Sequence, residues 1–291
     1  MPENVRICPL CGGNHSAFFD QRQFHGQVVV NRICQACGLV YQSPRMTEEE
    51  AAAFYQAEYR HMYQGEEGPI ARDFSTQAAR AESLFGFVRP QISAIASHLD
   101  IGCSTGLILL YFEKQYECLS IGIEPGEAYR EYARQQGLTV YTSLDEVEKS
   151  GKKRFSLISM SHVLEHLPDP LGYLVHLRET LLDPQGWLLL EVPNLYSHDS
   201  FETAHLVSYS SRTLTQTVEK AGFEIIKLER HGRPRSILLP LYIILLARPV
   251  SGSLKTLNIQ SEKQVALKRR VGMFRRRILE KLFPGRAWLK E

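Results

Sequence analysis

The sequence lacks the features that would place it in a membrane or outside the cell. Its longest nearly apolar stretch, residues 237–247, is too short to span a bilayer and contains Pro240. Its first residues, Met1–Asn4, have neither a basic region nor an apolar core, so no secretory signal is expected. With 44% apolar and 23% charged residues, the 291-residue composition is that of an ordinary globular protein. A cytoplasmic location is therefore predicted.

A strong net charge is also missing, because 34 Lys and Arg face 32 Asp and Glu, a formal net charge of +2. This balance argues against a chain that binds nucleic acid over its whole length. It hides an asymmetry: residues 251–291 contain 11 basic and 3 acidic side chains, a net of +8, and the rest has a net of −6. We therefore expect a mildly acidic body joined to a basic tail.

Cysteine is scarce, but four of the six cysteines form two matched pairs, Cys8-x-x-Cys11 and Cys34-x-x-Cys37. The 22 residues between the pairs are slightly more than is common in zinc ribbons. Structural disulfides are rare in a reducing compartment, and a redox motif would need no second copy. Four thiolates complete the tetrahedral shell that zinc prefers in closed structural sites. The spacing therefore predicts a structural Zn²⁺ held by Cys8, Cys11, Cys34 and Cys37.

The zinc ribbon is expected to cover residues 1–45, with a strand over residues 24–33. A capping box formed by Thr47 and Glu50 then predicts a helix that runs toward Tyr63. A second amphipathic stretch follows, from Phe74 to Val88. Residues 46–95 are thus expected to be a helical linker, and together with the zinc module they are expected to form a lid over a ligand pocket.

Strands and helices alternate along residues 96–250. This alternation predicts an α/β fold with a doubly wound, Rossmann-like sheet and helices on both faces. In such a sheet the ligand lies beyond the carboxyl ends of the strands, where the strand order reverses. Seven strands are expected, over Ser97–Ile101, Cys118–Ile123, Thr139–Tyr141, Phe155–Met160, Trp187–Val192, Phe223–Arg230 and Leu241–Arg248.

The first of these strands leads into a glycine-containing turn that favours one kind of ligand. Gly102 and Gly106 allow the backbone to pass close to a ligand without a Cβ clash. The second strand ends in Glu124, whose carboxylate can accept hydrogen bonds from both hydroxyls of a ribose. The spacing Gly102-x-Ser104-x-Gly106 is not that of a dinucleotide site. Asp100 would repel a pyrophosphate but attract an ammonium group, so S-adenosylmethionine is the expected cofactor.

These residues resemble those of class I S-adenosylmethionine-dependent methyltransferases. The resemblance rests on Leu99–Gly106, on Ile123-Glu124-Pro125 and on Ser161–Pro170 (Ser-His-Val-Leu-Glu-His-Leu-Pro-Asp-Pro), and it covers roughly residues 6–250. It is closer still to bacterial members with an N-terminal four-cysteine zinc module, which are often associated with sugar or surface-glycan modification. The resemblance implies that the methionine end of the cofactor is lined by Asp100, Gly102, Ser104 and Gly106, the ribose is held by Glu124, and the adenine lies near Ser143.

Methyl transfer to oxygen or nitrogen also needs a group that takes up a proton. His162 and His166 are four residues apart, just past the fourth expected strand, so a helix there would place them on one face. Three interpretations stay open. One of the two histidines is the general base; or His162, Glu165 and His166 bind a divalent metal; or Glu165 and His166 cap a turn. The second resembles the Glu-x-x-Glu-His pattern of metal-assisted quinone-precursor methyltransferases, with His162 in place of the first glutamate.

Two further groups could contribute to a substrate site. His205 is expected in a loop after the fifth strand of the sheet, where it could line the acceptor pocket. Tyr55, Tyr59 and Tyr63 recur every four residues on one helical face, as either a packed lid stripe or substrate contacts.

Within the basic tail of residues 251–291, the pattern of residues 261–283 predicts an amphipathic helix with one narrow apolar face flanked by cations. Three roles stay open for it: packing on the acidic body, peripheral contact with a membrane surface at the inner face of the membrane, and binding of RNA. Nucleic acid is the weaker partner, because residues 5–41 contain only three arginines and no lysine.

The sequence therefore predicts transfer of a methyl group from S-adenosylmethionine to a small-molecule or glycan-type acceptor at oxygen, as in sugar or surface-polysaccharide modification. The alternative is an RNA methyltransferase, or an RNA-binding zinc protein on a methyltransferase scaffold.

Overall fold

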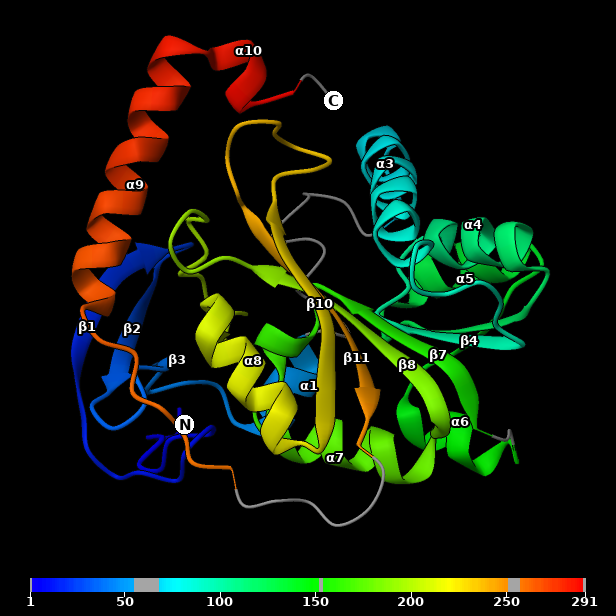
Figure 1. Cartoon of the computed structure of the whole chain (residues 1–291), viewed down its shortest axis with the longest axis horizontal. Coiled ribbons are helices and arrows are strands. Elements are labelled where there is room, and N and C mark those ends of the chain that lie inside the picture. Colours follow the sequence, from blue (N-terminus) through cyan, green and yellow to red (C-terminus); the bar gives the residue numbers. More distant parts are fainter. Residues whose placement is uncertain (1, 55–67, 152–153, 251–256, 290–291) are drawn as a thin grey trace.

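The structure is a computed structural model that describes residues 2–54, 68–151, 154–250 and 257–289. A central sheet lies between two layers of helices, with a smaller N-terminal sheet and a long C-terminal helix along one margin (Figure 1). Among the described residues, none of the helices combines the length and the apolar character that crossing a bilayer requires.

The central sheet has seven strands in the order β10-β11-β8-β7-β4-β5-β6. Neighbours from β6 to β8 are parallel, whereas β11 runs antiparallel to both β8 and β10. The strand order reverses between β4 and β7, and the predicted doubly wound α/β fold is confirmed. The bounds are β4 Ser97–Ile101, β5 Leu119–Ile123, β6 Thr139–Tyr141, β7 Phe155–Ser161, β8 Leu182–Pro193, β10 Phe223–His231 and β11 Tyr242–Pro249.

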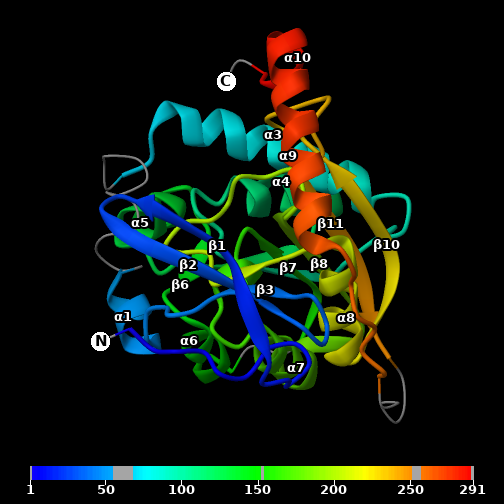
Figure 2. The ribbon, with the colours of Figure 1, turned by 90° about the vertical axis from the view of Figure 1, so that its left-hand side faces the viewer.

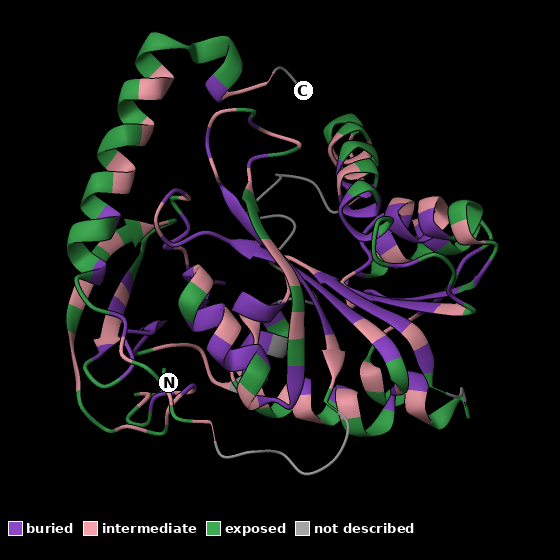
Figure 3. Ribbon diagram, in the orientation of Figure 1, coloured by how far each residue is buried: buried purple, intermediate pink, exposed green. Residues whose placement is uncertain are grey.

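Both faces of this sheet are covered, because its strands are apolar on both sides and would otherwise expose their side chains. Helices α3, α4 and α5 lie on one side and α6, α7 and α8 on the other (Figures 1 and 2). Most residues of the strands between these layers are buried (Figure 3). The bounds are α3 Ala71–Val88, α4 Leu107–Tyr116, α5 Glu127–Gln135, α6 Leu144–Lys149, α7 Pro170–Thr180 and α8 Ser211–Lys220.

The amphipathic stretch predicted over residues 74–88 is helix α3. Its apolar face, including Leu84 and Val88, packs in one cluster with Phe112 of α4 and with Leu157 and Leu189 of the sheet. Helix α3 is therefore part of the layer that covers the central sheet.

The N-terminal sheet has the order β1-β2-β3-β9 and bounds β1 Ser16–Phe24, β2 Gln27–Cys34, β3 Val40–Gln42 and β9 Val207–Ser208. The single strand predicted over residues 24–33 is wrong at its start. Phe24 ends β1, and the chain reverses at His25 and Gly26, whose φ angles of 45° and 78° form a tight turn before β2. Strand β9 comes from the segment after β8, so the N-terminal module is joined to the large domain by backbone pairing.

Helix α1 (Glu48–Ala53) begins with the predicted capping box. Thr47 Oγ1 accepts from the backbone N–H of Glu50, and the Glu50 carboxylate accepts from that of Thr47. The rest of the helix predicted toward Tyr63, with Tyr55 and Tyr59, lies outside the described residues.

The tail forms helix α9 (Val265–Leu282) and a short helix α10 (Pro284–Ala287). Helix α9 follows one margin of the molecule, from the N-terminal module to the loop between β10 and β11 (Figures 1 and 2).

Candidate active site

The four paired cysteines come together in the N-terminal module. Cys8 Sγ lies 3.6 Å from Cys37 Sγ, and Cys11 Sγ lies 3.5 Å from Cys34 Sγ. All four sulfurs lie within 4.8 Å of one another, which fits the shell of a tetrahedral zinc. Backbone N–H groups of Gly13 and Leu39 donate to the sulfurs of Cys11 and Cys37 at 3.4 and 3.5 Å. Cys103 and Cys118 are buried elsewhere and belong to the apolar core.

The glycine-containing turn after β4 lies at the switch point. Gly102, Ser104 and Gly106 all have positive φ, of 76°, 52° and 79°. A Cβ on Gly102 would lie 2.5 Å from Val163 Cγ2, and one on Gly106 would lie 2.3 Å from Leu138 Cδ1. The glycines are therefore required by the left-handed backbone and by packing within the protein, not only by the approach of a ligand.

Glu124 connects this turn to the next strand. Its Oε2 accepts from Ser104 N–H at 2.9 Å, and its Oε1 accepts from Gly126 N–H at 2.9 Å. The carboxylate therefore lies at the carboxyl ends of β4 and β5, where the resemblance places the ribose. Ser143 lies at the end of the neighbouring β6, and its Oγ accepts from Glu146 N–H as the N-cap of α6.

Asp100 is buried between β4 and β7. Its Oδ1 accepts from Ser159 Oγ at 2.5 Å, and the same hydroxyl is 2.7 Å from His98 Nε2. Burial raises the pKa of Asp100 to about 7, with a further contribution from the charge of Glu124. Among the described residues Asp100 Oδ2 has no hydrogen-bond partner, nor does the buried Thr105 Oγ1. Unpaired buried acceptors are costly, so these atoms fit a cofactor that brings an ammonium group.

His162 follows β7 directly and has a φ of 58°, unusual for a residue other than glycine. Its Nδ1 lies 3.4 Å from Glu165 Oε1 and its Nε2 lies 3.2 Å from Glu191 Oε2. The residue after it, Val163, is the one that packs against Gly102. The structure therefore brings His162 next to the expected cofactor turn. Strained conformations of this kind are concentrated at functional sites.

A regular α-helix would place His166 and His162 on one face, but the chain does not form one here. Residues Leu164–His166 form a short 3₁₀ helix, η2, and His166 Nδ1 bonds to the backbone carbonyl of Ala204 at 2.9 Å. Burial, followed by the charge of His205, lowers the pKa of His166 to about 4. A neutral imidazole held in this way suits a metal ligand better than a general base.

A second cluster with metal-ligand chemistry is formed by Glu165, His166 and His205, whose ligand atoms lie within 4.8 Å of one another. His205 Nδ1 bonds to the carbonyl of Ser200 at 2.8 Å, and its Nε2 lies 2.8 Å from Glu202 Oε1. The Nε2 atoms of His166 and His205 each lie 4.0 Å from Glu165 Oε1. Glu165 is 1% exposed, and neither of its oxygens has a well-aligned hydrogen-bond partner among the described residues. His205, rather than His162, thus completes this cluster.

Sequence reasoning missed the charged groups around His162. Glu191, fully buried on β8, pairs with Arg80 of α3 at 3.0 Å, with His231 of β10 at 3.2 Å and with Ser161 Oγ at 2.9 Å. The ring of Tyr242 packs edge-on against His162 with centroids 4.9 Å apart. A lone acid in the apolar sequence Leu188–Pro193 was the signal that could have indicated Glu191.

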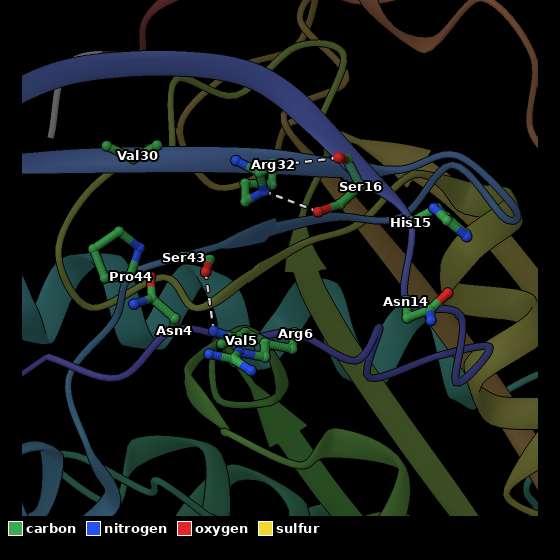
Figure 4. A pocket seen from close by; sticks show the side chains of 10 residues that line it. All are labelled: Asn4, Val5, Arg6, Asn14, His15, Ser16, Val30, Arg32, Ser43 and Pro44. Atoms are coloured by element: carbon green, nitrogen blue, oxygen red, sulfur yellow. Dashed lines mark hydrogen bonds between the residues drawn. The ribbon is translucent and has the colours of Figure 1, made fainter.

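An open cavity of about 650 Å³ lies elsewhere. All ten residues that line it belong to residues 4–44 of the N-terminal module, including Arg6, His15 and Arg32 (Figure 4). Arg32 is already committed to Ser16, which accepts from its guanidinium at 2.8 and 3.0 Å. This cavity is therefore separate from the residues at the edge of the central sheet.

The chain is similar to curated proteins over part of its length. Two are ubiquinone biosynthesis O-methyltransferases, from Histophilus somni (31% identical over 106 residues, 33% of this chain and 44% of the relative) and Actinobacillus pleuropneumoniae (26% over 136 residues, 43% and 53%). The chain thus spans about half the length of these curated relatives, or less.

Two solved structures share the fold. The 1,6-didemethyltoxoflavin-N1-methyltransferase of Burkholderia thailandensis matches with a TM-score of 0.57 and 19% identity, over 80% of this chain and all of that one. The plantazolicin methyltransferase BpumL matches with a TM-score of 0.51 and 14% identity, over 68% of this chain and 93% of that one. The family profile described as "Methyltransferase domain" matches residues 72–228, more than half of the sequence. The chain therefore belongs to this methyltransferase family.

Proposed function

We propose that the protein transfers a methyl group from S-adenosylmethionine to a hydroxyl group of a small-molecule acceptor. The observation that carries the proposal is the contact between Gly102 and Val163, because it brings a histidine, His162, to the turn that would hold the cofactor. The names of the curated relatives specify methylation at oxygen. Both solved neighbours were determined with bound S-adenosylhomocysteine.

In this proposal one group of residues binds the cofactor and another takes up the proton of the acceptor. S-adenosylmethionine supplies a sulfonium methyl group when bound. Asp100 would hold its ammonium group and Glu124 its ribose, with Gly102, Ser104, Gly106 and the segment at Ser143 around them. The imidazole of His162 would accept the proton of the acceptor hydroxyl, while Glu165 near Nδ1 fixes the orientation of the ring. Glu191 would stabilise the resulting imidazolium, and Arg80 keeps that carboxylate ionised.

We further propose that Glu165, His166 and His205 hold a divalent cation beside the acceptor. Histidines that ligate a metal usually donate their second ring N–H to a carbonyl or carboxylate, as His166 and His205 are placed to do. The buried carboxylate of Glu165 would be the charged ligand. Such a cation could orient the oxygens of a hydroxylated acceptor.

Titration calorimetry tests the cofactor half of the proposal. The wild type is expected to bind S-adenosylmethionine in the micromolar range, and Glu124→Gln to bind it at least tenfold more weakly. Glu127→Gln, an exposed acid three residues away, is the matched control and is expected to bind normally. Absence of binding to the folded wild type would overturn the proposal.

Methyl transfer from labelled cofactor tests the acceptor half. Phenols and catechols represent the small molecules, sugars and nucleotide sugars the glycan-type acceptors, and transfer RNA the alternative function. Label on a small hydroxylated compound supports the proposal, whereas label confined to RNA would replace it.

The second metal is tested by equilibrium dialysis with Mn²⁺ on the zinc-loaded protein. His205→Ala is expected to lose this binding while the zinc content stays at one per chain. His176→Ala, an exposed histidine on α7, is the control. Equal Mn²⁺ binding by both variants would contradict the assignment.

A further inference from the structure

Helix α9 is attached to the body by the side that carries Val265, Arg269 and Gly272. A Cβ on Gly272 would lie 2.0 Å from the carbonyl oxygen of Tyr196, so the helix backbone approaches that loop closely. Arg269 donates to the carbonyls of Leu195 and His198 and pairs with Asp199 at 3.5 Å. These contacts fix the helix on the loop that follows β8.

The apolar side of the same helix faces away from the body. The five large apolar side chains on this side are between 40% and 64% exposed, although such a set on one helical face would normally be buried. The expectation that the tail packs its apolar stripe on the acidic body is therefore wrong. The reason is that Gly272, Arg269 and Val265 occupy the body-facing side. The stripe consists of Leu267, Val271, Phe274, Ile278 and Leu282.

Cations border this stripe on both sides. At 100° per residue, Arg270, Arg277 and Lys281 lie along one edge. Arg275 lies along the other edge with Lys268, whose ammonium pairs with Glu262 at 3.0 Å. The one acid of the helix, Glu280, is turned away from the stripe, where it accepts from Arg276 at 2.8 Å and from Trp288 Nε1 at 3.0 Å. Much of α9 is exposed (Figure 3). Its exposed side is thus apolar at its centre and carries cations along both edges.

The charge pattern decides between the possible occupants. In a pair of α9 helices from two copies of the chain, the cations at the edges would face one another and repel. A polyanion such as RNA would satisfy the cations but leave the apolar centre in water. The headgroups and acyl chains of an anionic bilayer complement both parts of this surface.

We propose that this side of α9 binds the surface of an anionic lipid bilayer, with the stripe inserted at the headgroup boundary. The helix would lie in the plane of the membrane, and the cations at its edges would contact lipid phosphates. Because the opposite side of α9 holds Leu195 and His198, the loop that carries His205 would be fixed close to the membrane. The proposal stands independently of the methyl-transfer function.

Flotation of the full chain with lipid vesicles tests the proposal. Vesicles of equal parts phosphatidylcholine and phosphatidylglycerol are expected to bind the wild type, and pure phosphatidylcholine to bind it at least tenfold more weakly. Leu267→Glu combined with Phe274→Glu is expected to reduce binding to the anionic vesicles at least tenfold. Arg270→Gln and Arg277→Gln are each expected to reduce it about fivefold.

Leu119→Glu is the matched control, because Leu119 on β5 is 55% exposed, as is Leu267. It is expected to bind vesicles like the wild type, and all variants are expected to keep the wild-type melting temperature. Unchanged vesicle binding by the folded Leu267→Glu, Phe274→Glu variant would overturn the proposal. So would light scattering that shows a dimer abolished by this variant, because the stripe would then be covered by a second copy.

Discussion

His162 Nε2 lies 3.2 Å from Glu191 Oε2, and Arg80 Nε lies 3.0 Å from the same oxygen. Burial alone would raise the pKa of Glu191, but Arg80 and the two neighbouring histidines, His162 and His231, hold it well below its usual value. The carboxylate is therefore ionised next to His162, where it would stabilise an imidazolium. This arrangement supports His162, rather than His166, as the base.

We expect His162→Asn to lower kcat about 10²–10⁴-fold, the usual contribution of a general base. Asparagine tolerates the left-handed backbone that this position requires, so the fold should persist. Affinity for S-adenosylmethionine should stay unchanged in calorimetry, since the ring is assigned to the acceptor. The control is His176→Asn on the surface of α7. A kcat close to that of the wild type would exclude His162 as the base.

Asp100 should make stability depend on pH. Its pKa is raised from 3.8 to about 7 by burial, so between these values the folded protein holds a proton that the unfolded chain has lost. The contribution of Asp100 to the free energy of unfolding is therefore fully present below about pH 4 and is lost as the pH rises through about 7. Urea unfolding should show the wild type losing stability over this range relative to Asp100→Asn. Parallel pH profiles for the two proteins would contradict the assignment.

The raised pKa of Asp100 also predicts that cofactor binding releases a proton. An ammonium group next to Asp100 favours its ionised form, so binding near pH 6 should release up to about one proton. Calorimetry in buffers of different ionisation enthalpy measures this number. Asp100→Asn should release none, and it should bind S-adenosylmethionine more weakly.

The features that the sequence predicted are those fixed by local spacing. The seven strands, the capping box at Thr47 and the two cysteine pairs depend on residues a few positions apart. His205 joins Glu165 only because the segment after β8 folds back, with Leu206 N–H bonded to the carbonyl of Glu165 at 2.8 Å. An amphipathic pattern, in turn, does not say which side of a helix meets the body, so the orientation of α9 needed the structure.

Zinc removal should weaken the binding of the acceptor more than the binding of the cofactor. Strand β3 of the zinc module pairs with β9, and Gln42 N–H donates to the carbonyl of Leu206, next to His205. Cys37→Ser should therefore lose zinc by elemental analysis, lower the melting temperature and raise the KM for acceptor more than the KM for S-adenosylmethionine. Cys118→Ser, buried outside the cluster, should keep its zinc. Zinc retained in Cys37→Ser would contradict the four-cysteine site.

Alanine substitutions at Gly106 and Gly137 distinguish the cost of backbone strain from the cost of a steric clash. Both have positive φ, of 79° and 88°, so alanine at either position should cost about 1 kcal/mol of backbone strain. Only at Gly106 would the new Cβ meet a side chain, at 2.3 Å from Leu138 Cδ1, whereas nothing lies within 4 Å at Gly137. Leu138 is itself held in a buried cluster and cannot simply move aside.

We therefore expect Gly106→Ala to lower the free energy of unfolding by about 2–4 kcal/mol, because overpacking adds to the strain. Gly137→Ala should lower it by about 1 kcal/mol. In a Leu138→Ala background the cost of Gly106→Ala should shrink toward that of Gly137→Ala, which a double-mutant cycle in urea measures. Equal costs for the two glycines in the wild-type background would mean that the left-handed backbone alone requires Gly106.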